Sequence, residues 1–300
     1  MASLLQKILT REAWVVAVRS RQEAEAGGRF LFLPVRRDRF YADPILFRSA
    51  LFFEDYRYSG RKAVISACEL RPDAGHGKIR VCLERPYHLS YPFVFEWQGN
   101  AFMLPESGSS QRLELYRSIE FPWRWELHTV LLENVSLVDA TLFEYNRRWW
   151  IFANSRAAGG NSWRDLSVFC ADSPLGPWQA HARNPVVSSL GSSRPAGRIL
   201  RRGGEWLRPS QDCSSVYGRA VVFNRIDELT EESYHESPTV TLGPEWIHGN
   251  IGTHTYSLSN EFEAVDLRFR IPRRPLPYQW RFEQRPWKLA DLFGSHDIRS

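Results

Sequence analysis

Apolar residues along the 300-residue chain fall into strand-like runs that restart at intervals of about 50 residues. Each restart places a polar or ring-bearing residue near the same point. A period of this size is typical of the blades of a β-propeller, in which each repeat is one small sheet. The five segments are Ala42–Phe47, Tyr91–Phe95, Val138–Phe143, Arg194–Leu200 and Thr253–Leu258.

A short polar turn and a second apolar strand follow each of the first four segments, which indicates one hairpin per blade. The sequence therefore predicts an all-β fold: a single five-bladed β-propeller domain over residues 1–300, with blades starting near 42, 91, 138, 194 and 253. The second strands are Leu51–Glu54, Ala101–Glu106, Trp149–Asn154 and Trp206–Asp212.

A further strand, Trp14–Arg19, precedes the first repeat and is available to close the ring. We expect it to form the outer strand of the last blade, beside Glu263–Phe269 and Tyr278–Phe282, because an exposed edge would otherwise remain. Helical periodicity is limited to two short stretches, Ser3–Arg11 and Trp287–Phe293.

Composition agrees with one large β domain, since 43% of the residues are hydrophobic and 12 are Trp. The net charge of +5 is modest for this length, and no nucleic-acid partner is expected. Only four of the 39 basic residues are Lys, which leaves 35 Arg. Codon composition is the simpler explanation, but guanidinium groups also suit the phosphate or carboxylate of a nucleotide-sugar or acidic glycan.

The four cysteines show no close C-x-x-C spacing, so we expect no metal and no cofactor. Three of them lie in apolar strand contexts, which is typical of free thiols in a reducing compartment. The N-terminal stretch is a poor signal peptide, and no run has the apolar length of a membrane span. The expected location is the cytoplasm, with secretion by another route left open, and the oligomeric state is open.

Propeller geometry predicts where the polar residues of the repeat meet. The inner strand of each blade starts, and the second strand ends, at the same rim of the central channel. Carboxylates, an arginine, a histidine and amides on one rim are the chemistry of a sugar-processing site. The strand-start residues are Asp43, Tyr91, Asp139, Arg194 and His254, and the strand-end residues are Glu54, Glu106, Asn154, Gln211 and Asp212.

The candidate catalytic residues are the carboxylates Asp43, Asp139, Glu106 and Asp212, because two carboxyl groups on one rim can be driven to different pKa values and so supply an acid and a base. Each also has a structural explanation. Asp43 could cap the Asp-Pro turn, Glu106 could be solvated at a strand end, and Asp212 could be a hydrogen-bonding hub. Glu54 and Glu236 are weaker candidates.

The candidate substrate-binding residues are those able to hold hydroxyl or anionic groups. Arg194 takes the place that Asp holds in the first and third blades, so it could bind a phosphate or neutralise the two aspartates. The remaining members are Tyr91, Arg208, Gln211, His254 and Asn154. Surface loops are expected at Glu23–Gly28 and Arg156–Trp163, and the second could overhang the site.

Several short motifs resemble the N-terminal domain of plant glucosamine inositolphosphorylceramide transferase and its bacterial relatives, over roughly Phe40 to Glu236. That domain is similar in turn to the five-bladed propellers of arabinanase and β-xylosidase type glycoside hydrolases. The motifs are Tyr41–Pro44, Ser90–Glu96, Met103–Ser107, Leu175–Trp178, His181–Val186, Arg194–Arg198, and Arg208–Cys213 followed by Tyr217–Gly218.

The resemblance implies that Asp43 matches the general base of those hydrolases and Asp139 the aspartate that tunes pKa and orients substrate. Their general-acid glutamate does not carry over, because the fourth blade opens with Arg194–Gly197. Glu106 or Asp212 would have to supply the acid. In the plant protein the sugar-transferring domain is a separate one.

Together these features favour a carbohydrate-active enzyme that makes or breaks a glycosidic bond in bacterial surface-glycan metabolism, with a carbohydrate or sugar-phosphate ligand. The alternative is a non-catalytic glycan-binding or scaffolding propeller, because a fold does not establish chemistry.

Overall fold

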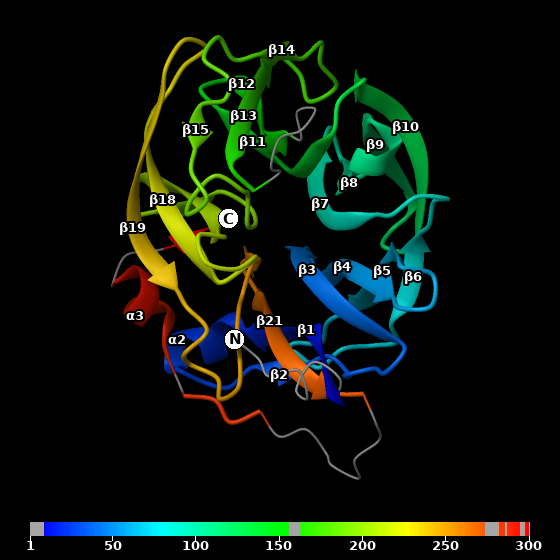
Figure 1. The fold of residues 1–300 in the computed structure, drawn as a ribbon. Coiled ribbons are helices and arrows are strands. Elements are labelled where there is room, and N and C mark those ends of the chain that lie inside the picture. Colours follow the sequence, from blue (N-terminus) through cyan, green and yellow to red (C-terminus); the bar gives the residue numbers. More distant parts are fainter. Residues whose placement is uncertain (1–8, 156–162, 274–281, 286, 295–297, 300) are drawn as a thin grey trace.

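The structure is a computed structural model that describes residues 9–155, 163–273, 282–285, 287–294 and 298–299. Its strands form five sheets arranged radially about one axis, which confirms the predicted five-bladed β-propeller (Figure 1). Within each blade, neighbouring strands are antiparallel, as expected for a chain that winds outward through short turns.

Blades 1 to 3 contain consecutive strands in order from the axis outward. Blade 1 comprises β3 (Arg39–Phe47), β4 (Ala50–Arg57), β5 (Lys62–Glu69) and β6 (Arg80–Leu83); blade 2 comprises β7 (Ser90–Trp97), β8 (Asn100–Glu106), β9 (Arg112–Glu120) and β10 (Arg124–Glu133); blade 3 comprises β11 (Leu137–Tyr145), β12 (Arg148–Ser155) and β13 (Asp165–Ala171), with β14 (Gln179–Ala180) and β15 (Val187–Ser188) both paired to β13.

Blades 4 and 5 have short inner strands of three residues each. These strands begin after Arg194 and His254, so these two residues precede their strands, whereas the sequence pattern predicts them at strand starts. Blade 4 comprises β16 (Leu200–Arg202), β17 (Glu205–Asp212), β18 (Ala220–Leu229) and β19 (Tyr234–Leu242), with β22 (Ile298–Arg299) paired to β16; blade 5 comprises β20 (Tyr256–Leu258), β21 (Phe262–Pro272), β1 (Thr10–Ser20) and β2 (Leu31–Phe32).

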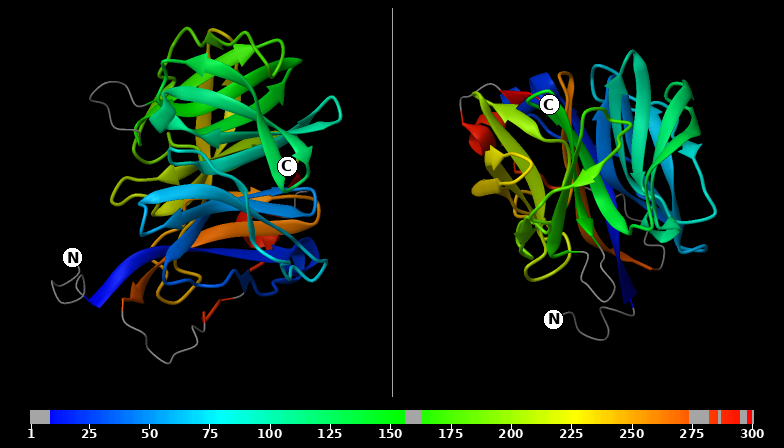
Figure 2. Two further views of the ribbon diagram at one scale, coloured as in Figure 1. Left: turned by 90° about the vertical axis from the view of Figure 1, so that its right-hand side faces the viewer. Right: turned by 90° about the horizontal axis from the view of Figure 1, so that it is seen from above.

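The ring closes where the N-terminal strand β1 joins the blade built by the C-terminal part of the chain. β1 pairs antiparallel with β21 over 11 residues, with Val15 opposite Leu267, and the two strands lie side by side in Figures 1 and 2. This is the pairing predicted for Trp14–Arg19. The strand is third in its blade and not outermost, because β2 pairs along its outer side. The predicted strand Tyr278–Phe282 lies outside the described residues except for Phe282.

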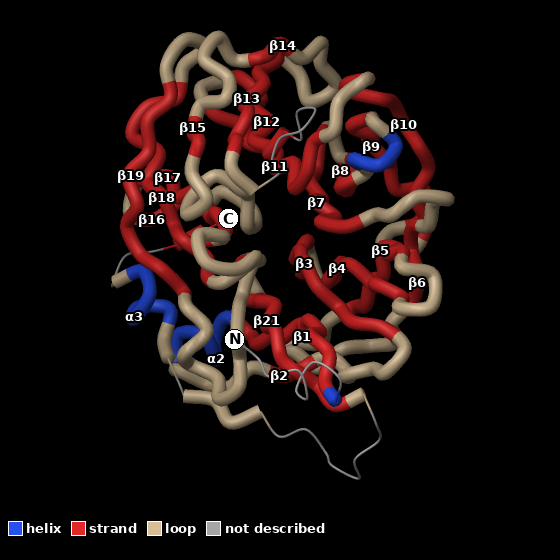
Figure 3. The backbone as a smooth tube through the Cα atoms, in the orientation of Figure 1, coloured by secondary structure: helices blue, strands red, loops and turns tan. Residues whose placement is uncertain are grey.

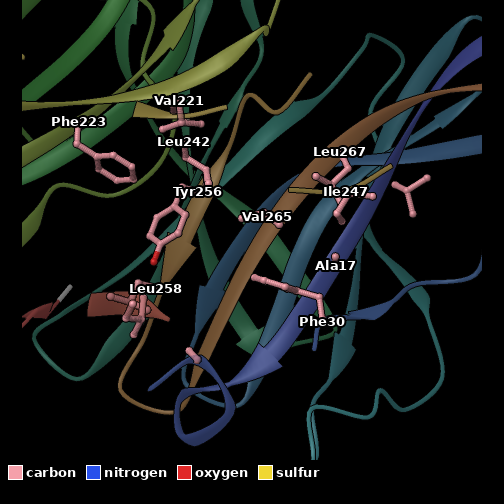
Figure 4. Close-up of a cluster of buried hydrophobic side chains, with 14 of the residues drawn as sticks. Ala17, Phe30, Val221, Phe223, Leu242, Ile247, Tyr256, Leu258, Val265 and Leu267 are labelled. Atoms are coloured by element: carbon pink, nitrogen blue, oxygen red, sulfur yellow. The ribbon is translucent and has the colours of Figure 1, made fainter. Parts of the chain in front are cut away.

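Alternate side chains of β1 pack into two different interblade clusters. Val15 and Ala17 join the cluster in Figure 4, which also contains Tyr256 and Val265, whereas Val16 and Val18 pack against side chains of blade 1. This period of two is what a strand buried on both faces requires. Strand β1 is therefore part of the core as well as a closure device.

Few helices occur in the described residues (Figure 3). α2 (Arg21–Ala26) forms where a loop is expected from sequence, because Ser20 caps its first turn and Gly27 ends it at φ 81°. α3 (Leu289–Phe293) falls within the predicted helix at Trp287–Phe293, and a 3-10 turn spans Gly108–Ser110. The predicted helix Ser3–Arg11 lies mostly outside the described residues. None of the described helices has the length and apolar character needed to cross a bilayer.

A left-handed residue interrupts the inner strand of each of the first three blades. Asp43, Tyr91 and Asp139 have φ values of 51°, 42° and 54°, and the strand register shifts at each of them. Such a conformation costs roughly 1–3 kcal/mol in a non-glycine residue and persists where the surroundings enforce it. The interruption re-aims the side chain within the strand, as β-bulges do, and sets the geometry of the site.

Candidate functional site

Asp43 lies at the centre of a buried network that joins three blades. Its Oδ2 accepts a hydrogen bond from the backbone N–H of Tyr91 (3.1 Å), and its Oδ1 accepts one from the Thr255 hydroxyl (3.0 Å). Nε2 of His254 lies 3.6 Å from the same Oδ1. Burial raises the pKa of Asp43 to about 6; His254 opposes the shift and the carboxylates of Asp139 and Asp266 add to it.

Asp266, on β21, is a site residue that the sequence analysis missed. Its carboxylate accepts hydrogen bonds from the backbone N–H groups of Asp43 (3.0 Å), His254 (2.9 Å) and Thr255 (3.0 Å). It also lies 2.5 Å from Nδ1 of His254. The available signal was an acidic residue within the apolar strand Glu263–Phe269. Asp266 lies on the second strand of blade 5, as Glu54 lies on the second strand of blade 1.

His254 is held between this carboxylate and an aromatic ring. Its imidazole stacks on Trp14 of β1, with the ring centroids 3.8 Å apart. Burial by itself would lower the pKa of His254, but Asp266 and then Asp43 outweigh that effect and raise it. The strand that closes the ring therefore also fixes one wall of the site.

Asp139 forms a second cluster, with residues that precede β16 and end β17. Nε of Arg194 donates to Oδ2 of Asp139 (2.5 Å), and the amide of Gln211 donates to the same oxygen (2.9 Å). Gln211 also donates to the carbonyl of Pro195 (3.0 Å). Gln211 therefore positions Asp139 and the segment that carries Arg194. Arg194 is thus paired with an aspartate, as one of the two sequence alternatives has it; the other alternative, that it binds a phosphate, stays a prediction.

Glu106, at the end of β8, is the most accessible carboxyl group of this set, with 17% of its side chain exposed. Its Oε2 lies 3.8 Å from Nη2 of Arg194. Burial, followed by the carboxylate of Asp139, raises the pKa of Glu106 to about 8, and Arg194 opposes the shift. Glu106 therefore carries its proton at neutral pH, as a general acid must.

A cavity of about 320 Å³ opens above this cluster, and we call it the cup. Glu106 and Arg194 line it together with residues that the sequence analysis did not select as ligands: His88, Trp163 and Tyr217. The guanidinium carbon of Arg194 lies 5.0 Å from the centroid of the Tyr217 ring. The centroids of the Tyr217 and Trp163 rings are 5.4 Å apart. Asp43 is not among the lining residues and lies further inside the protein. Partly exposed aromatic rings beside polar groups suit a sugar ligand.

Glu54 belongs to the same group of acids, although the sequence treats it as a weaker candidate. Nε2 of His88 lies 3.4 Å from its Oε1. Burial, and then the carboxylates of Asp43 and Glu106, raise the pKa of Glu54 well above its ordinary value. Because so many carboxyl groups share a buried region, they cannot all ionise at neutral pH.

Two other candidates form ion pairs away from the cup. Oδ2 of Asp212 accepts from Arg219 (2.8 Å) and its Oδ1 from the N–H of Ser214 (2.9 Å). These bonds overcome burial and keep the pKa of Asp212 below its ordinary value, so Asp212 is a poor proton donor at neutral pH. Arg208 is buried and forms a bidentate pair with Glu236, at 2.8 and 2.6 Å. The guanidinium of Arg208 is thus paired within the protein, and it is not available to bind a ligand.

The last two candidates are buried within the propeller. The Tyr91 hydroxyl pairs with Thr141 (2.7 Å) and accepts from the N–H of Gly197 (2.7 Å). It therefore ties blades 2, 3 and 4 together. Asn154, on β12, is fully buried, and its backbone pairs with Val138. Both positions contribute to the frame of the site.

One group of side chains has the composition of a metal site. Asp43, His254 and Asp266 offer ligand atoms within 4.8 Å of one another. Two carboxylates and an imidazole could hold a divalent cation. The same atoms also satisfy one another, because the imidazole bridges the two carboxylates. The sequence prediction of no metal and no cofactor stays a prediction.

The fold and the site define a class of protein: a five-bladed β-propeller with carboxyl groups gathered at its axis. Among solved structures, the chain is similar to an exo-β-1,3-galactanase from Clostridium thermocellum, with a TM-score of 0.53 and 11% identity over 72% of this chain and 56% of that one. It is also similar to a family 117 glycoside hydrolase of the marine bacterium Zobellia galactanivorans, with a TM-score of 0.50 and 9% identity over 95% of this chain and 97% of that one. At these identities the likeness concerns the fold alone.

Sequence similarity is more specific. Residues 35–249 match the family described as glucosamine inositolphosphorylceramide transferase 1, N-terminal, and the chain belongs to this family. It is 39% identical over 215 residues to glucosamine inositolphosphorylceramide transferase 1 of Oryza sativa subsp. japonica, and 32% identical over 205 residues to that of Arabidopsis thaliana. These matches cover 69% and 66% of this chain but only 28% and 27% of the relatives. The resemblance noted in the sequence motifs is confirmed.

Proposed function

We propose that this chain is a carbohydrate-active enzyme that makes or breaks a glycosidic bond, with Glu106 as the general acid and Asp43 as the base. The observation that carries the proposal is the difference between the two carboxyl groups. Glu106 lines an open cavity and has a pKa raised to about 8, whereas the pKa of Asp43 is raised only to about 6. One group is thus protonated and the other mostly ionised at neutral pH, which is the division of roles that glycosidic chemistry needs.

In this mechanism Glu106 donates its proton to the oxygen of the leaving group as the bond from that oxygen to the anomeric carbon breaks. Because Asp43 does not line the cup, in this proposal it accepts the proton of the attacking water or sugar hydroxyl through one intervening water. Arg194 and Gln211 hold Asp139 in place, and Tyr217 and Trp163 offer aromatic faces to the sugar ring. Asp212 is left out, because its carboxylate is paired with Arg219 and stays ionised.

The names of the relatives point to sugar transfer, and the neighbouring folds to glycoside hydrolysis. Since the chain spans little more than a quarter of those relatives, we limit the proposal to the class of bond. The setting we propose is the cytoplasm and surface-glycan metabolism. Four buried free cysteines support a reducing compartment.

A second candidate is a glycan-binding propeller without turnover. Two points favour it: the sequence resemblance implies that Arg194 stands where those glycoside hydrolases have a glutamate, and Asp43 does not line the cup. A thermal-shift screen of nucleotide-sugars and glycans, followed by product analysis for each ligand found, tests both candidates. Product formation that requires Glu106 supports the enzyme. Binding to the cup with no product from any ligand or pair of ligands supports the binding module.

A further inference from the structure

A second cavity lies at the end of the axis opposite the cup. Inner strands run from the cup to hairpin turns at the other end, as β3 does from Asp43 to Phe47. The cavity there has a volume of about 730 Å³, takes lining residues from all five blades, and shares none with the cup. Its size is in the range that binds small ligands. It would function independently of the chemistry proposed for the cup.

The inner part of this cavity carries a cation without a carboxylate partner in the described part of the chain. Arg198 follows Gly197, whose N–H bonds Tyr91, so the backbone that presents it is fixed. Its guanidinium lies over the ring of Phe93, 4.6 Å from the centroid, and donates to the carbonyl of Val94. The side chain is half-buried, and burial lowers its pKa to about 10. The other N–H donors of the Arg198 guanidinium can donate hydrogen bonds to an anionic group of a ligand.

Aromatic rings form the walls beside this cation. Trp149 and Trp206 are half-buried, so each presents part of its indole to the cavity. Trp149 packs on Phe95 with ring centroids 6.1 Å apart, and Trp206 packs edge-on against Phe143 at 4.9 Å. These contacts hold the indoles in fixed orientations. Rigid aromatic faces are suited to stacking against a sugar ring.

Charged residues on the rim complete the chemistry. Arg48 is paired with Glu96 (2.8 Å), so the two neutralise each other. Glu144 and Glu261 are exposed lining residues whose carboxylates can accept hydrogen bonds from hydroxyl groups. A ligand with several acid groups would be repelled by the rim carboxylates. A ligand with one acid group and several hydroxyls would match both the Arg198 guanidinium and the rim carboxylates.

We infer that this cavity is a second carbohydrate site, which binds a monosaccharide unit that carries one acid group. The acid group pairs with Arg198, the ring lies against Trp149 or Trp206, and hydroxyls donate to the rim carboxylates. The acid can be the carboxylate of a uronic acid or the phosphate of a sugar phosphate, which share this chemistry. No bond is made or broken at this end of the channel.

Nitrogen-15 NMR of the tryptophan indoles tests the inference with the full chain, because the tryptophans mark the two ends of the axis. Trp149 and Trp206 report on the second cavity, and Trp163 reports on the cup. Glucuronate, glucose 6-phosphate and glucose are titrated separately. We expect saturable shifts at Trp149 and Trp206 with one or both acidic sugars, and much weaker ones with glucose. Which acidic sugar binds identifies the acid group.

Three variants decide the role of the cation. Arg198→Met should weaken binding of the acidic sugar about tenfold or more, since it removes charge-assisted hydrogen bonds. Arg117→Met is the matched control, because Arg117 is a partly exposed arginine paired with Glu126 and lines neither cavity; it should not change the affinity. If Arg198→Met does not fold, Arg198→Lys keeps the charge without the fork and should weaken binding severalfold. No saturable shift with either acidic sugar, shifts confined to Trp163, equal binding of glucose, or full affinity in the Arg198 variant would overturn the inference.

Discussion

Arg194 is closer to Asp139 than to Glu106. Its Nε lies 2.5 Å from Oδ2 of Asp139, whereas its Nη2 lies 3.8 Å from Oε2 of Glu106. The guanidinium therefore forms a hydrogen bond with the aspartate, and the glutamate receives only a longer-range attraction. This asymmetry explains how a carboxyl group beside an arginine retains a pKa raised to about 8.

The first prediction concerns the pH dependence of stability. Because the pKa of Glu106 rises from an ordinary 4.5 to about 8 on folding, the native state holds a proton that the unfolded state releases. The contribution of Glu106 to the free energy of unfolding is therefore full below pH 4.5 and is lost as pH rises to about 8. Glu106→Gln removes this titration. Urea unfolding of both proteins between pH 5 and 9 should show a smaller decline in the variant.

Asp212→Asn is the matched control, since Asp212 is a paired carboxylate whose pKa is lowered. It should leave the decline above pH 5 unchanged. Parallel profiles for Glu106→Gln and the unmodified protein would show that another group titrates there.

The second prediction separates the two roles proposed for the cup. Once a substrate is found, Asp43→Asn should lower turnover by about 100-fold or more while substrate binding changes little, because the amide keeps the shape but cannot accept the proton. Glu106→Gln should also lower turnover, and substrates with a better leaving group should recover part of it. Rates and binding constants for the variants measure both effects. An unchanged rate in Asp43→Asn would remove Asp43 as the base.

A third prediction follows from the buried pair of Arg208 and Glu236. Arg208→Met should destabilise the fold by about 3–5 kcal/mol, because it leaves Glu236 buried without its partner. The double variant with Glu236→Met should recover most of that loss. Arg219→Met, at a pair in which the arginine is 47% exposed, should cost less than about 1 kcal/mol. Chemical denaturation measures all three, and equal losses for Arg208→Met and Arg219→Met would contradict the structural role.

The sequence predicts the propeller because its repeat is carried by the apolar strands, which every blade must bury. The same rule leads us to expect Asp43, Glu106, Asp139, Asp212 and His254 around one cavity, since equivalent repeat positions converge at the axis, but of these only Glu106 lines the cup. The repeat does not specify which side chains form ion pairs or hydrogen bonds with one another. The local pattern gave no reason to expect that Arg208 would pair with Glu236, 28 residues away, or Asp212 with Arg219.

Asp266 escaped the sequence analysis for a related reason. The fifth blade takes strands from both ends of the chain, so its order does not follow the hairpin pattern of the other four. The sequence does show an acidic residue inside an apolar strand. Its partners are far from it in the repeat pattern, however, because Asp43 lies in blade 1 and His254 precedes the inner strand of blade 5. Such a residue becomes recognisable only when the ring is closed.

The last prediction tests that closure. Deletion of residues 1–20 removes β1, and with it an 11-residue pairing with β21, the ring of Trp14 on His254, and side chains of two interblade clusters. The inner strands β20 and β21 would be left with an open edge, so the truncated protein should aggregate or unfold without cooperativity. Deletion of residues 1–8 leaves β1 intact and should melt like the full chain. Calorimetry and size-exclusion chromatography compare the two. A cooperative, monomeric 21–300 fragment with the same melting temperature would mean that β1 is not required to hold the ring closed.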